Sequence, residues 1–481
     1  MVTAIEPGGL VRADGFAYRT RVEAVMRGPL VTMPPDTTLA AAARRMTDEA
    51  ISAVVVADGA PAGIVTERDL MRLVADGGGD ALIRPLAAVM SAPLVTIRSD
   101  ALVASALGRM ERLGIRHLVV VDSADCPVGM VSARALLRLR ARDALAIGDG
   151  IAAAADAAAI GRVRAAVPGL AAALRRDGAS ALDVASAIAT TLRDATARAA
   201  ALATEEMRGA WGPAPARWCL LVLGSGGRGE SLLVPDQDNA LIHDGAAADD
   251  AWFAEFGRRI ADILDAAGVP YCTGGVMARE ARWRYDRAGW REQVAGWLAA
   301  KDGAALLDVD IFFDFYPVAG AGDLADALRS DAVAAAAAAP LFLRMLALHV
   351  ADLRPPLGFF GRFATRDGRI DLKKGGTMPI VAAARTLALA AGAPAVATHE
   401  RLAAAVARGR LTDADRAMLA SALEIIVGAM LDQQIRDVAD GRPPGSAVEP
   451  RRMDAAARSA LRAALRDIRA VPELVTAGLS R

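Results

Sequence analysis

The pattern of apolar and polar residues repeats itself near the start of the chain. The segment beginning at Val25 reads VMRGPLVTMPPDTTLAAAARRM, and the segment beginning at Val89 reads VMSAPLVTIRSDALVASALGRM, so that Met90 stands 64 residues after Met26. In each copy, apolar residues at helical spacing give way to two valine-rich runs separated by a turn, and then to a second helical stretch. The pattern therefore predicts the same order twice: helix, strand, turn, strand, helix.

After the repeat, apolar residues recur mostly at helical spacing. They predict connecting helices from Asp143 to Met207, with a break at Val167-Pro168-Gly169, and a second helical region from about Ala335 onward. Between these regions, two short apolar runs predict buried strands, one from Trp218 to Leu223 and one from Leu306 to Val318. The chain is therefore expected to combine small sheets with many helices.

Length and composition favour a helix-rich protein of several domains. The 481 residues exceed what one core usually organises. Hydrophobic residues make up 54% of the chain, but alanine supplies many of them and aromatic residues only 4%, which favours helical packing over a membrane protein. No window offers the roughly 18 strongly apolar residues of a membrane span, and the first residues lack the pattern of a targeting peptide. We expect a cytoplasmic protein without membrane contacts.

Charge and cysteine content narrow the classes of partner. Lys+Arg and Asp+Glu are both 56, so no overall field attracts nucleic acid, and none is expected as a partner. The three cysteines, Cys126, Cys219 and Cys272, are far apart and lack CxxC spacing, which indicates reduced buried thiols. The four histidines lack the spacing of zinc ligands. Any anionic ligand must therefore be bound by a local site.

The N-terminal repeat resembles the CBS module, which occurs as tandem pairs and often holds an adenine nucleotide between the copies. In the first copy, Thr66 ends a strand where its hydroxyl can reach a phosphate. Asp69 opens the following helix, where its carboxylate can accept hydrogen bonds from ribose hydroxyls. The second copy departs from this pattern, because Ser132 replaces the threonine and Ala135 the aspartate. An ordinary helix N-cap without a ligand is the alternative. The resemblance implies an adenine nucleotide effector and, since such pairs commonly associate, a homodimer.

A glycine-rich turn followed by paired acids marks the chemical centre. The run from Gly224 to Gly227 follows the first predicted strand, and glycine lets backbone N–H groups approach an anion. Arg228 stands where a Walker A loop would continue toward its Lys-Ser/Thr pair. Asp236 and Asp238 alternate in a segment that leads into an apolar strand, so both should project from one face. Adjacent carboxylates repel unless a cation lies between them, and hard oxygen ligands suit Mg²⁺.

This arrangement resembles the nucleotidyltransferase superfamily that includes DNA polymerase β and the PII uridylyltransferase. The resemblance implies that Gly224 and Ser225, with Gly227 and Arg228, hold a nucleoside triphosphate, and that the paired aspartates hold one or two metal ions. It also implies a third carboxylate on a later strand.

For that third carboxylate we expect Asp314, because it lies in the apolar sequence IFFDF, where an unpaired acid would be costly without metal. Asp310 is the rival. Asp314 is expected as a metal ligand and as a catalytic residue that polarises or deprotonates the attacking hydroxyl. A structural acid paired with an arginine is the alternative.

Basic residues offer further candidates for phosphate binding. Arg279, Arg282 and Arg284 follow a Gly-Gly pair, although surface arginines are common. Lys373 and Lys374 lie in a glycine-rich insert ahead of a predicted helix and are candidate nucleotide-binding residues, for phosphate or for an acidic acceptor. Ordinary solvated lysines are the alternative.

The motifs DQDNALI, GGVMA and IFFDF, together with this insert, resemble a bacterial family of nucleotidyltransferase-like proteins. In that family a CBS pair precedes a uridylyltransferase-like domain and a helical substrate-binding domain, and the resemblance extends from about Val25 to Val475. Members often begin with a cyclic-nucleotide-binding domain, which does not fit into the short leader here. Gly226 stands where an acid is usual and Ser231 where a glutamine is usual, and neither change removes a metal ligand.

These resemblances imply a multidomain α/β and α fold. The expected parts are a leader (1–17), a tandem CBS pair (18–142, with modules 18–78 and 82–142), a helical connector (143–210), a polymerase β-like α+β nucleotidyltransferase domain (211–330) and a C-terminal helical bundle that binds substrate (331–481).

The leading hypothesis is Mg²⁺-dependent transfer of a nucleoside monophosphate from a triphosphate to a hydroxyl of a protein or small molecule. Adenine nucleotides bound to the CBS pair would regulate it. Two alternatives stay open: a catalytically silent nucleotide sensor or scaffold, and an enzyme that removes a nucleotidyl group from a modified protein.

Overall fold

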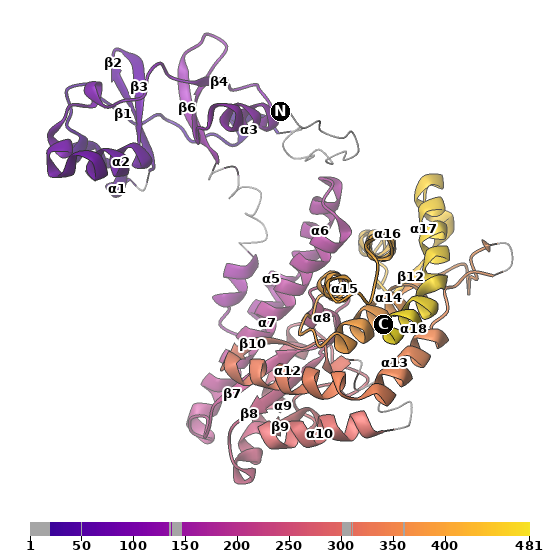
Figure 1. Ribbon diagram of the computed structural model, residues 1–481. Coiled ribbons are helices and arrows are strands. Elements are labelled where there is room, and N and C mark those ends of the chain that lie inside the picture. The colour runs from indigo at the N-terminus through magenta and orange to yellow at the C-terminus, as the bar shows by residue number, and fades with distance from the viewer. Residues whose placement is uncertain are drawn as a thin grey trace. The chain divides into compact units, whose positions relative to one another are not determined.

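The computed structural model describes residues 20–49, 51–133, 136, 147–300, 309, 311–358 and 361–481. The chain divides into two compact units, Met1–Asp143 and Ala144–Arg481 (Figure 1). Among the described residues, each unit has its own hydrophobic cores, two in the first and three in the second. The division follows the change from the repeated pattern to the helical one.

Each half of the first unit is a three-stranded sheet packed against helices. The sheets have the orders β1-β2-β3 and β4-β5-β6, and in each the first pair is parallel and the second antiparallel. Ala53 pairs with Thr66 and His117 with Ser132, so Thr66 and Ser132 occupy equivalent positions, and the predicted order is confirmed up to the second strand of each copy. The helix predicted to close the second copy lies mostly outside the described residues. The elements are β1 (Thr32–Met33), α1 (Leu39–Asp48), β2 (Ala53–Asp58), β3 (Ala60–Thr66) and α2 (Glu67–Gly77), then β4 (Thr96–Arg98), α3 (Val103–Leu113), β5 (His117–Val121) and β6 (Pro127–Ser132).

The two halves exchange the segments that precede their sheets. Val22, in the 3-10 helix η1 (Val22–Ala24), packs with Leu118 in the core of the second half. Leu86, in η3 (Leu86–Ala88), packs with Val54 in the core of the first half. Neither half therefore has a complete core without residues from the other, and the pair forms one folding unit.

A four-stranded sheet in the second unit positions the candidate site. Its order is β10-β7-β8-β9, with β7 antiparallel to β10 and β8, and β8 parallel to β9. Alternate residues face opposite layers: Leu220 and Leu241 pack against α7 and α9, whereas Leu221 and Ile242 pack with the tryptophans of α10 and with α12. The elements are α5 (Ala157–Arg164), α6 (Val167–Arg176), α7 (Ala181–Ala210), β7 (Trp218–Val222), α8 (Gly224–Arg228), β8 (Asn239–His243), α9 (Asp250–Ala266), β9 (Arg284–Asp286), α10 (Arg287–Ala299), β10 (Tyr316–Gly320) and α12 (Gly322–Ala337).

The long helix α7 belongs to two cores of the second unit. Most of its buried residues pack with α9 beneath the sheet, while Ala181 and Ala185 at its start pack with the C-terminal helices. The carboxylate of Glu424 accepts hydrogen bonds from the backbone N–H groups of Ala181 (2.6 Å) and Leu182 (3.1 Å), which have no partner within the helix. The C-terminal elements are α13 (Pro340–Asp352), β11 (Ile370–Asp371), the π-helical turn η7 (Lys373–Thr377), α14 (Met378–Ala390), α15 (Thr398–Ala407), α16 (Asp413–Ala439), β12 (Ala447–Val448), α17 (Ala455–Asp467) and α18 (Val471–Ser480).

The strand predicted from Leu306 to Val318 is wrong over most of its described part. Residues 309, 311 and 312 are helical, and β10 begins only at Tyr316. Phe312 and Phe315 are fully buried and pack with the tryptophans of α10. A short apolar run indicates burial but does not distinguish a strand from a helical turn, which explains the error.

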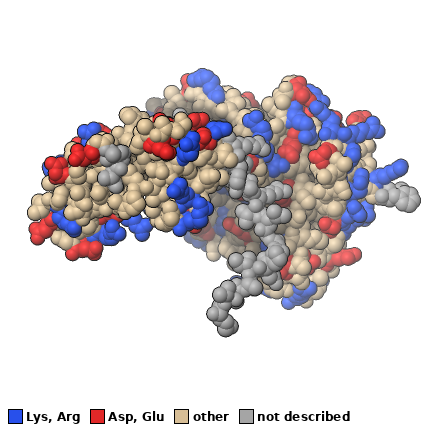
Figure 2. All heavy atoms as spheres, turned by 90° about the horizontal axis from the view of Figure 1, so that it is seen from above, with Lys and Arg blue, Asp and Glu red and all other residues tan. Residues whose placement is uncertain are grey.

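Apolar helices and surface charge bear on contacts with a membrane or nucleic acid. One stretch, Ala157–Arg176, is long and apolar enough to cross a membrane, and α12 with α13 would qualify only as a pair bent by 87°. Core helices satisfy the same criterion, so this is weak evidence for a span. On the face drawn in Figure 2, basic and acidic side chains are interspersed, in agreement with the balanced composition.

Candidate active site

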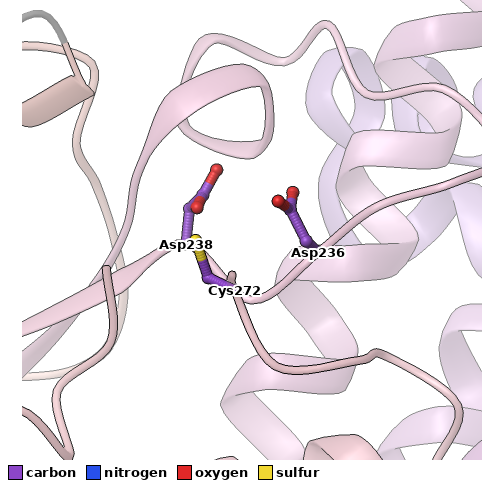
Figure 3. A group of neighbouring side chains, drawn as sticks. All are labelled: Asp236, Asp238 and Cys272. Carbon is purple, nitrogen blue, oxygen red and sulfur yellow. The ribbon is translucent and has the colours of Figure 1, made fainter. Parts of the chain in front are cut away.

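Two aspartates converge at the start of β8. Gln237 between them is buried, and its side-chain amide donates to two backbone carbonyls, at 2.9 and 2.8 Å. In this extended segment the flanking Asp236 and Asp238 therefore project to the opposite side. One oxygen of each and the sulfur of Cys272 all lie within 4.8 Å of one another. Figure 3 shows the two carboxylates rising on the same side of the chain, with Cys272 beside Asp238. The structure thus brings the two acids together as expected.

The glycine turn after β7 borders these carboxylates. Gly224, the first residue of α8, has φ +56°, and a Cβ there would lie 2.8 Å from Oδ2 of Asp238. At Gly227, a Cβ would lie 1.8 Å from the backbone oxygen of Asp314. The backbone N–H of Leu223 donates to the carbonyl of Asp238 at 2.8 Å, which fixes the turn against the acidic segment. Glycine is required at both positions because the backbone passes so close to its neighbours.

The two carboxylates are partly buried and repel each other, and the positive charge near them does not offset both effects. Oδ1 of Asp238 is buried and has no hydrogen-bond partner among the described residues. Burial, together with the charge of Asp236, raises the pKa of Asp238 to about 6, although the neighbouring thiol of Cys272 and the charge of Lys373 act in the opposite direction. A divalent cation between the two carboxylates would offset both effects, and a pair of carboxylates suits Mg²⁺.

Asp314 is enclosed by arginines. Its fully buried carboxylate accepts hydrogen bonds from Arg228 (2.5 Å), Arg385 (3.1 and 2.7 Å) and Arg401 (2.6 Å). Burial alone would raise the pKa of Asp314, but the three guanidinium groups hold it well below its usual range. Both oxygens are occupied, so the expected roles as metal ligand and proton acceptor do not fit, and the alternative of a structural acid does. The rival, Asp310, lies outside the described residues.

The phosphate-binding role expected for Arg228 does not fit its contacts. Its guanidinium donates to Glu230 at 2.8 Å as well as to Asp314, and its side chain is only 14% exposed. Burial lowers the pKa of Arg228, but the two carboxylates outweigh this and raise it above the ordinary value. Arg228 is therefore a fixed structural cation. Ser225 is half-buried, with its hydroxyl 3.5 Å from that of Ser231.

The two lysines of the glycine-rich insert are exposed and begin the turn η7. Their backbone N–H groups donate to Asp371, at 2.9 Å for Lys373 and 3.2 Å for Lys374. The positive charge of Lys373 lowers the pKa of Asp238, against the larger effects of burial and of Asp236. Neither ammonium forms a salt bridge with a carboxylate in the described part of the chain. Lys373 thus remains a candidate phosphate ligand.

The arginines after the Gly-Gly pair have mainly structural contacts. Arg284 is 5% exposed and donates to Asp250 at 3.0 Å and to the carbonyl of Ala278 at 2.8 Å, so its expected phosphate contact does not fit. Arg282 donates to the carbonyl of Gly274 at 2.5 Å. Arg279 lies over the ring of a tyrosine, with 5.0 Å between the guanidinium carbon and the ring centroid.

Two residues near the site have no role in the expectations drawn from the sequence. Arg193, on α7, donates to the carbonyls of Gly226 (2.8 Å) and Gly227 (2.7 Å) and so holds the glycine turn. Its guanidinium carbon also lies 3.8 Å from the ring centroid of Tyr316. Cys272 lies beside Asp238 and was expected to be only a buried thiol. Helical spacing marks Arg193 only as a residue of a helix, and a lone cysteine has no spacing to interpret.

A cavity of about 620 Å³ in the first unit contains the predicted CBS ligand residues, Thr66, Asp69 and Ser132. Thr66 and Asp69 form a reciprocal helix cap: Asp69 accepts from the backbone N–H (3.1 Å) and hydroxyl (2.7 Å) of Thr66, and its own N–H donates to that hydroxyl (3.3 Å). Thr66 and Asp69 therefore do cap the helix, as the alternative held, and they also line a cavity large enough for a ligand. Ser52 and His117 also line this cavity, with their side chains 2.9 Å apart.

Known proteins similar to this chain match it over about a quarter of its length. An uncharacterized protein of Methanopyrus kandleri is 32% identical over 117 residues, which are 24% of this chain and 60% of that protein. The arabinose 5-phosphate isomerase of Pseudomonas aeruginosa is 40% identical over 138 residues, 27% of this chain and 40% of the isomerase. The chain thus spans less than two thirds of either relative.

Among solved structures, a CBS-domain containing protein from Agrobacterium tumefaciens is 27% identical. The match covers 25% of this chain and 98% of that one, with a TM-score of 0.24. A CBS domain protein from Pyrobaculum aerophilum complexed with AMP is 28% identical over 24% of this chain and 90% of that one, with a TM-score of 0.23.

Family models cover most of the chain. The CBS domain matches residues 22–76 and 86–142, "Putative nucleotidyltransferase DUF294" matches 165–304, and "Putative nucleotidyltransferase substrate binding domain" matches 340–478. The nucleotidyltransferase model, which matches residues 165–304, begins within the predicted connector and includes α7, in agreement with the packing of α7 beneath the sheet. Matches, fold and acid pair agree with the resemblance seen in the sequence, and the chain belongs to the DUF294 nucleotidyltransferase family, with a tandem CBS pair and the family's substrate-binding domain.

Proposed function

We propose that this protein transfers a nucleoside monophosphate from a nucleoside triphosphate to a hydroxyl of a protein or small molecule, in a reaction that requires Mg²⁺ or a related divalent cation. The observation that supports this most directly is the convergence of Asp236 and Asp238 beside the backbone of Gly224. This places two candidate metal ligands beside glycine backbone, whose N–H groups can bind an anion where no side chain intervenes.

The residues of the site divide the work between them. Asp236 and Asp238 would hold the cation, which would neutralise phosphate charge during transfer. Gly224 and Ser225 would border the phosphates, and Lys373 would approach them from the exposed insert. The acceptor oxygen forms a bond to the α-phosphorus while the bond to the bridging oxygen breaks, pyrophosphate leaves, and the hydroxyl proton passes to solvent. Positioning and charge stabilisation would supply most of the rate.

The first unit would regulate this activity. Its cavity, lined by Thr66, Asp69 and Ser132, is proposed to take an adenine nucleotide. Such a ligand changes activity only if it binds the active and inactive states with different affinities. We further propose a cytoplasmic homodimer without nucleic-acid partners.

Label transfer tests the proposed reaction. The full chain, with and without cell lysate, is incubated with each α-labelled nucleoside triphosphate and Mg²⁺, and label on macromolecules and small products is measured. We expect transfer with one nucleotide that is abolished by Asp236→Asn and by chelator. Asp265→Asn, which changes an exposed aspartate of α9, is the matched control and should keep activity. Absence of transfer with every nucleotide would refute the proposal.

The enclosure of Asp314 favours a second candidate, a sensor that binds nucleotide without turnover. The described residues offer only two carboxylates and a thiol as a group that could hold a metal. In a sensor, Asp236→Asn would change nucleotide binding and partner association, while the unmodified protein would show no label transfer under any condition. The same incubation therefore separates the two functions.

A further inference from the structure

The sulfur of Cys272 lies with the acid pair in one group of possible metal donors. One oxygen of Asp236, one oxygen of Asp238 and Sγ of Cys272 are mutually within 4.8 Å (Figure 3). We propose that Cys272 is the third protein ligand of the divalent cation, and that this mixed oxygen and sulfur set binds Mn²⁺, Co²⁺ or Zn²⁺ more tightly than Mg²⁺. The inference deepens the proposed function, because it concerns the same site.

The fold holds Cys272 at this place from both sides. Before it, Tyr271 forms a parallel bridge with Gln237, the residue between the two aspartates. After it, the N–H of Gly275 donates to the carbonyl of Cys272 at 3.0 Å, in a turn where Gly275 has φ +67°. The N–H of Asn239, at the start of β8, donates to the carbonyl of Val276 at 3.0 Å. The sulfur is therefore carried on a segment fixed to the same strand as the acids.

An unpartnered buried oxygen points to a ligand at this place. Oδ1 of Asp238 is buried without a hydrogen-bond partner in the described part of the chain, and leaving such a charged atom unpaired is costly. The sulfur of Cys272 lies within 4.8 Å of an oxygen of the same carboxylate, so sulfur and oxygen are already neighbours. A bound cation would give Asp238 the partner that it lacks.

The spacing suits coordination by all three residues. Metal–sulfur and metal–oxygen bonds of about 2.3 and 2.1 Å allow donor atoms to be up to about 4.4 Å apart across one ion. The three donor atoms lie within 4.8 Å of one another, so binding of one ion by all three requires the side chains to rotate toward it. On coordination the thiol releases its proton to solvent and binds as thiolate. Thiolate favours softer divalent cations, whereas Mg²⁺ prefers oxygen ligands alone.

Cobalt titration gives a readout that does not depend on activity. Co²⁺ is added to the full chain, and the sulfur-to-cobalt charge-transfer absorption in the near ultraviolet is recorded. We expect the band in the native protein, its loss in Cys272→Ser, and its retention in Cys126→Ser, which changes an exposed thiol of the first unit. By calorimetry, Cys272→Ser should weaken Mn²⁺ binding about tenfold or more, with a smaller change for Mg²⁺.

The outcomes separate this inference from the proposed reaction. If Co²⁺ binds without a charge-transfer band, or if Cys272→Ser binds Mn²⁺ as tightly as the native protein, Cys272 is not a ligand. Label transfer with Mg²⁺ under those conditions would leave the proposed function intact. A band that depends on Cys272 in a protein without transfer activity would support the ligand set and refute the transferase. Circular dichroism of Cys272→Ser confirms that the variant is folded.

Discussion

At the scale of single residues, steric contacts require the glycines of the turn between β7 and the acid pair. Gly224 adopts a left-handed conformation against a carboxylate oxygen, and Gly227 passes against the main chain of Asp314. These glycines allow the backbone to lie where a side chain would fill the space beside Asp238. The same feature that suits phosphate binding is thus also needed for folding.

Gly227→Ala should therefore be strongly destabilising. The new Cβ would lie 1.8 Å from the backbone oxygen of Asp314, and main chain cannot rotate away as a side chain can. We expect a loss of unfolding free energy on the order of 3 kcal/mol, measured by urea denaturation. Gly296→Ala is the matched control, because its Cβ would meet nothing within 4 Å inside α10, and it should be neutral or stabilising by up to about 1 kcal/mol. Equal stability of the two variants would contradict the steric account.

Asp238 should lower the stability of the metal-free protein. Its folded pKa of about 6, raised first by burial and then by Asp236, exceeds the unfolded value of about 3.9. The native state therefore binds this proton more tightly, and the stability contributed by the protonated form is lost as pH rises from about 4 through about 6. Near neutral pH in chelator, Asp238→Asn should be more stable than the native protein by roughly 1–3 kcal/mol.

Saturating divalent cation should reverse this order, because ligand binding to the native state stabilises it. Denaturation of the native protein, Asp238→Asn and the control Asp265→Asn, each with chelator and with cation, measures both effects. An Asp238→Asn variant that is less stable than the native protein in chelator would show that the carboxylate has a partner that satisfies it.

The paired acids were predictable from the sequence, and the role of Asp314 was not. Alternation in an extended segment follows from local geometry, so Asp236 and Asp238 could be placed on one face. Asp314 is paired with Arg228, Arg385 and Arg401, two of which come from helices far along the chain. A partner set of this kind depends on tertiary contacts that no local pattern contains.

At the scale of elements, helix α7 supports the candidate site from beneath the sheet. Glu424 caps its start, its middle packs beneath the sheet, and Arg193 donates to the carbonyls of Gly226 and Gly227. Burial at this contact lowers the pKa of Arg193. The helix is thus part of the nucleotidyltransferase unit, although the sequence indicated only connecting helices.

Arg193→Ala should impair transfer without removing a group that contacts substrate. Loss of two hydrogen bonds to the turn should let its backbone shift, and misplacement near 1 Å can reduce rate about a hundredfold. We expect kcat to fall by about tenfold to a hundredfold, with a smaller change in KM for the metal–nucleotide complex. Arg193→Lys should recover part of the loss, and Arg208→Ala, at an exposed arginine of the same helix, should have no effect. A kcat unchanged in Arg193→Ala would exclude a positioning role.

Elements with strong local signals were predicted well. The repeated strands of the first unit and the strand after Arg217 have continuous β-branched or apolar sequence bounded by turn residues, and the structure contains them. The run around Phe312 failed, because its apolar residues fill an aromatic cluster around a helical turn. The exchange of Val22 and Leu86 between the CBS halves depends on contacts between the repeats, which similarity between the copies does not indicate.

At the scale of the whole molecule, buried charge joins the sheet to the C-terminal helices within the second unit. Asp314 binds Arg385 of α14 and Arg401 of α15, and Glu230, beside the glycine turn, accepts from the N–H of Thr398 at 2.8 Å. Breaking such a buried cluster typically costs about 3–5 kcal/mol. The regions matched by the two nucleotidyltransferase family models are therefore parts of one compact unit, and a substrate held by the helices would be held close to the glycine turn.

The domain order was predictable because each part has its own sequence signal: a repeat, a glycine turn with acids, and a helical tail. The sequence could not indicate how the helices close over the sheet, since that depends on the arginine cluster and on the packing of α7. The proposed function depends on a small group of residues within this architecture, because fold alone does not determine chemistry.

The most direct test of the central claim is calorimetric titration of the full chain with nucleoside triphosphates, with divalent cation or with chelator. The account predicts binding of at least one triphosphate that requires the cation and is lost in both Asp236→Asn and Asp238→Asn, while Asp265→Asn binds normally. The same titration of Thr66→Ala measures how much of the signal comes from nucleotide binding to the first unit, and that part is subtracted. Binding to the second unit that is equally tight in chelator, or unchanged in both aspartate variants, would contradict the assignment of the acid pair as a metal–nucleotide site.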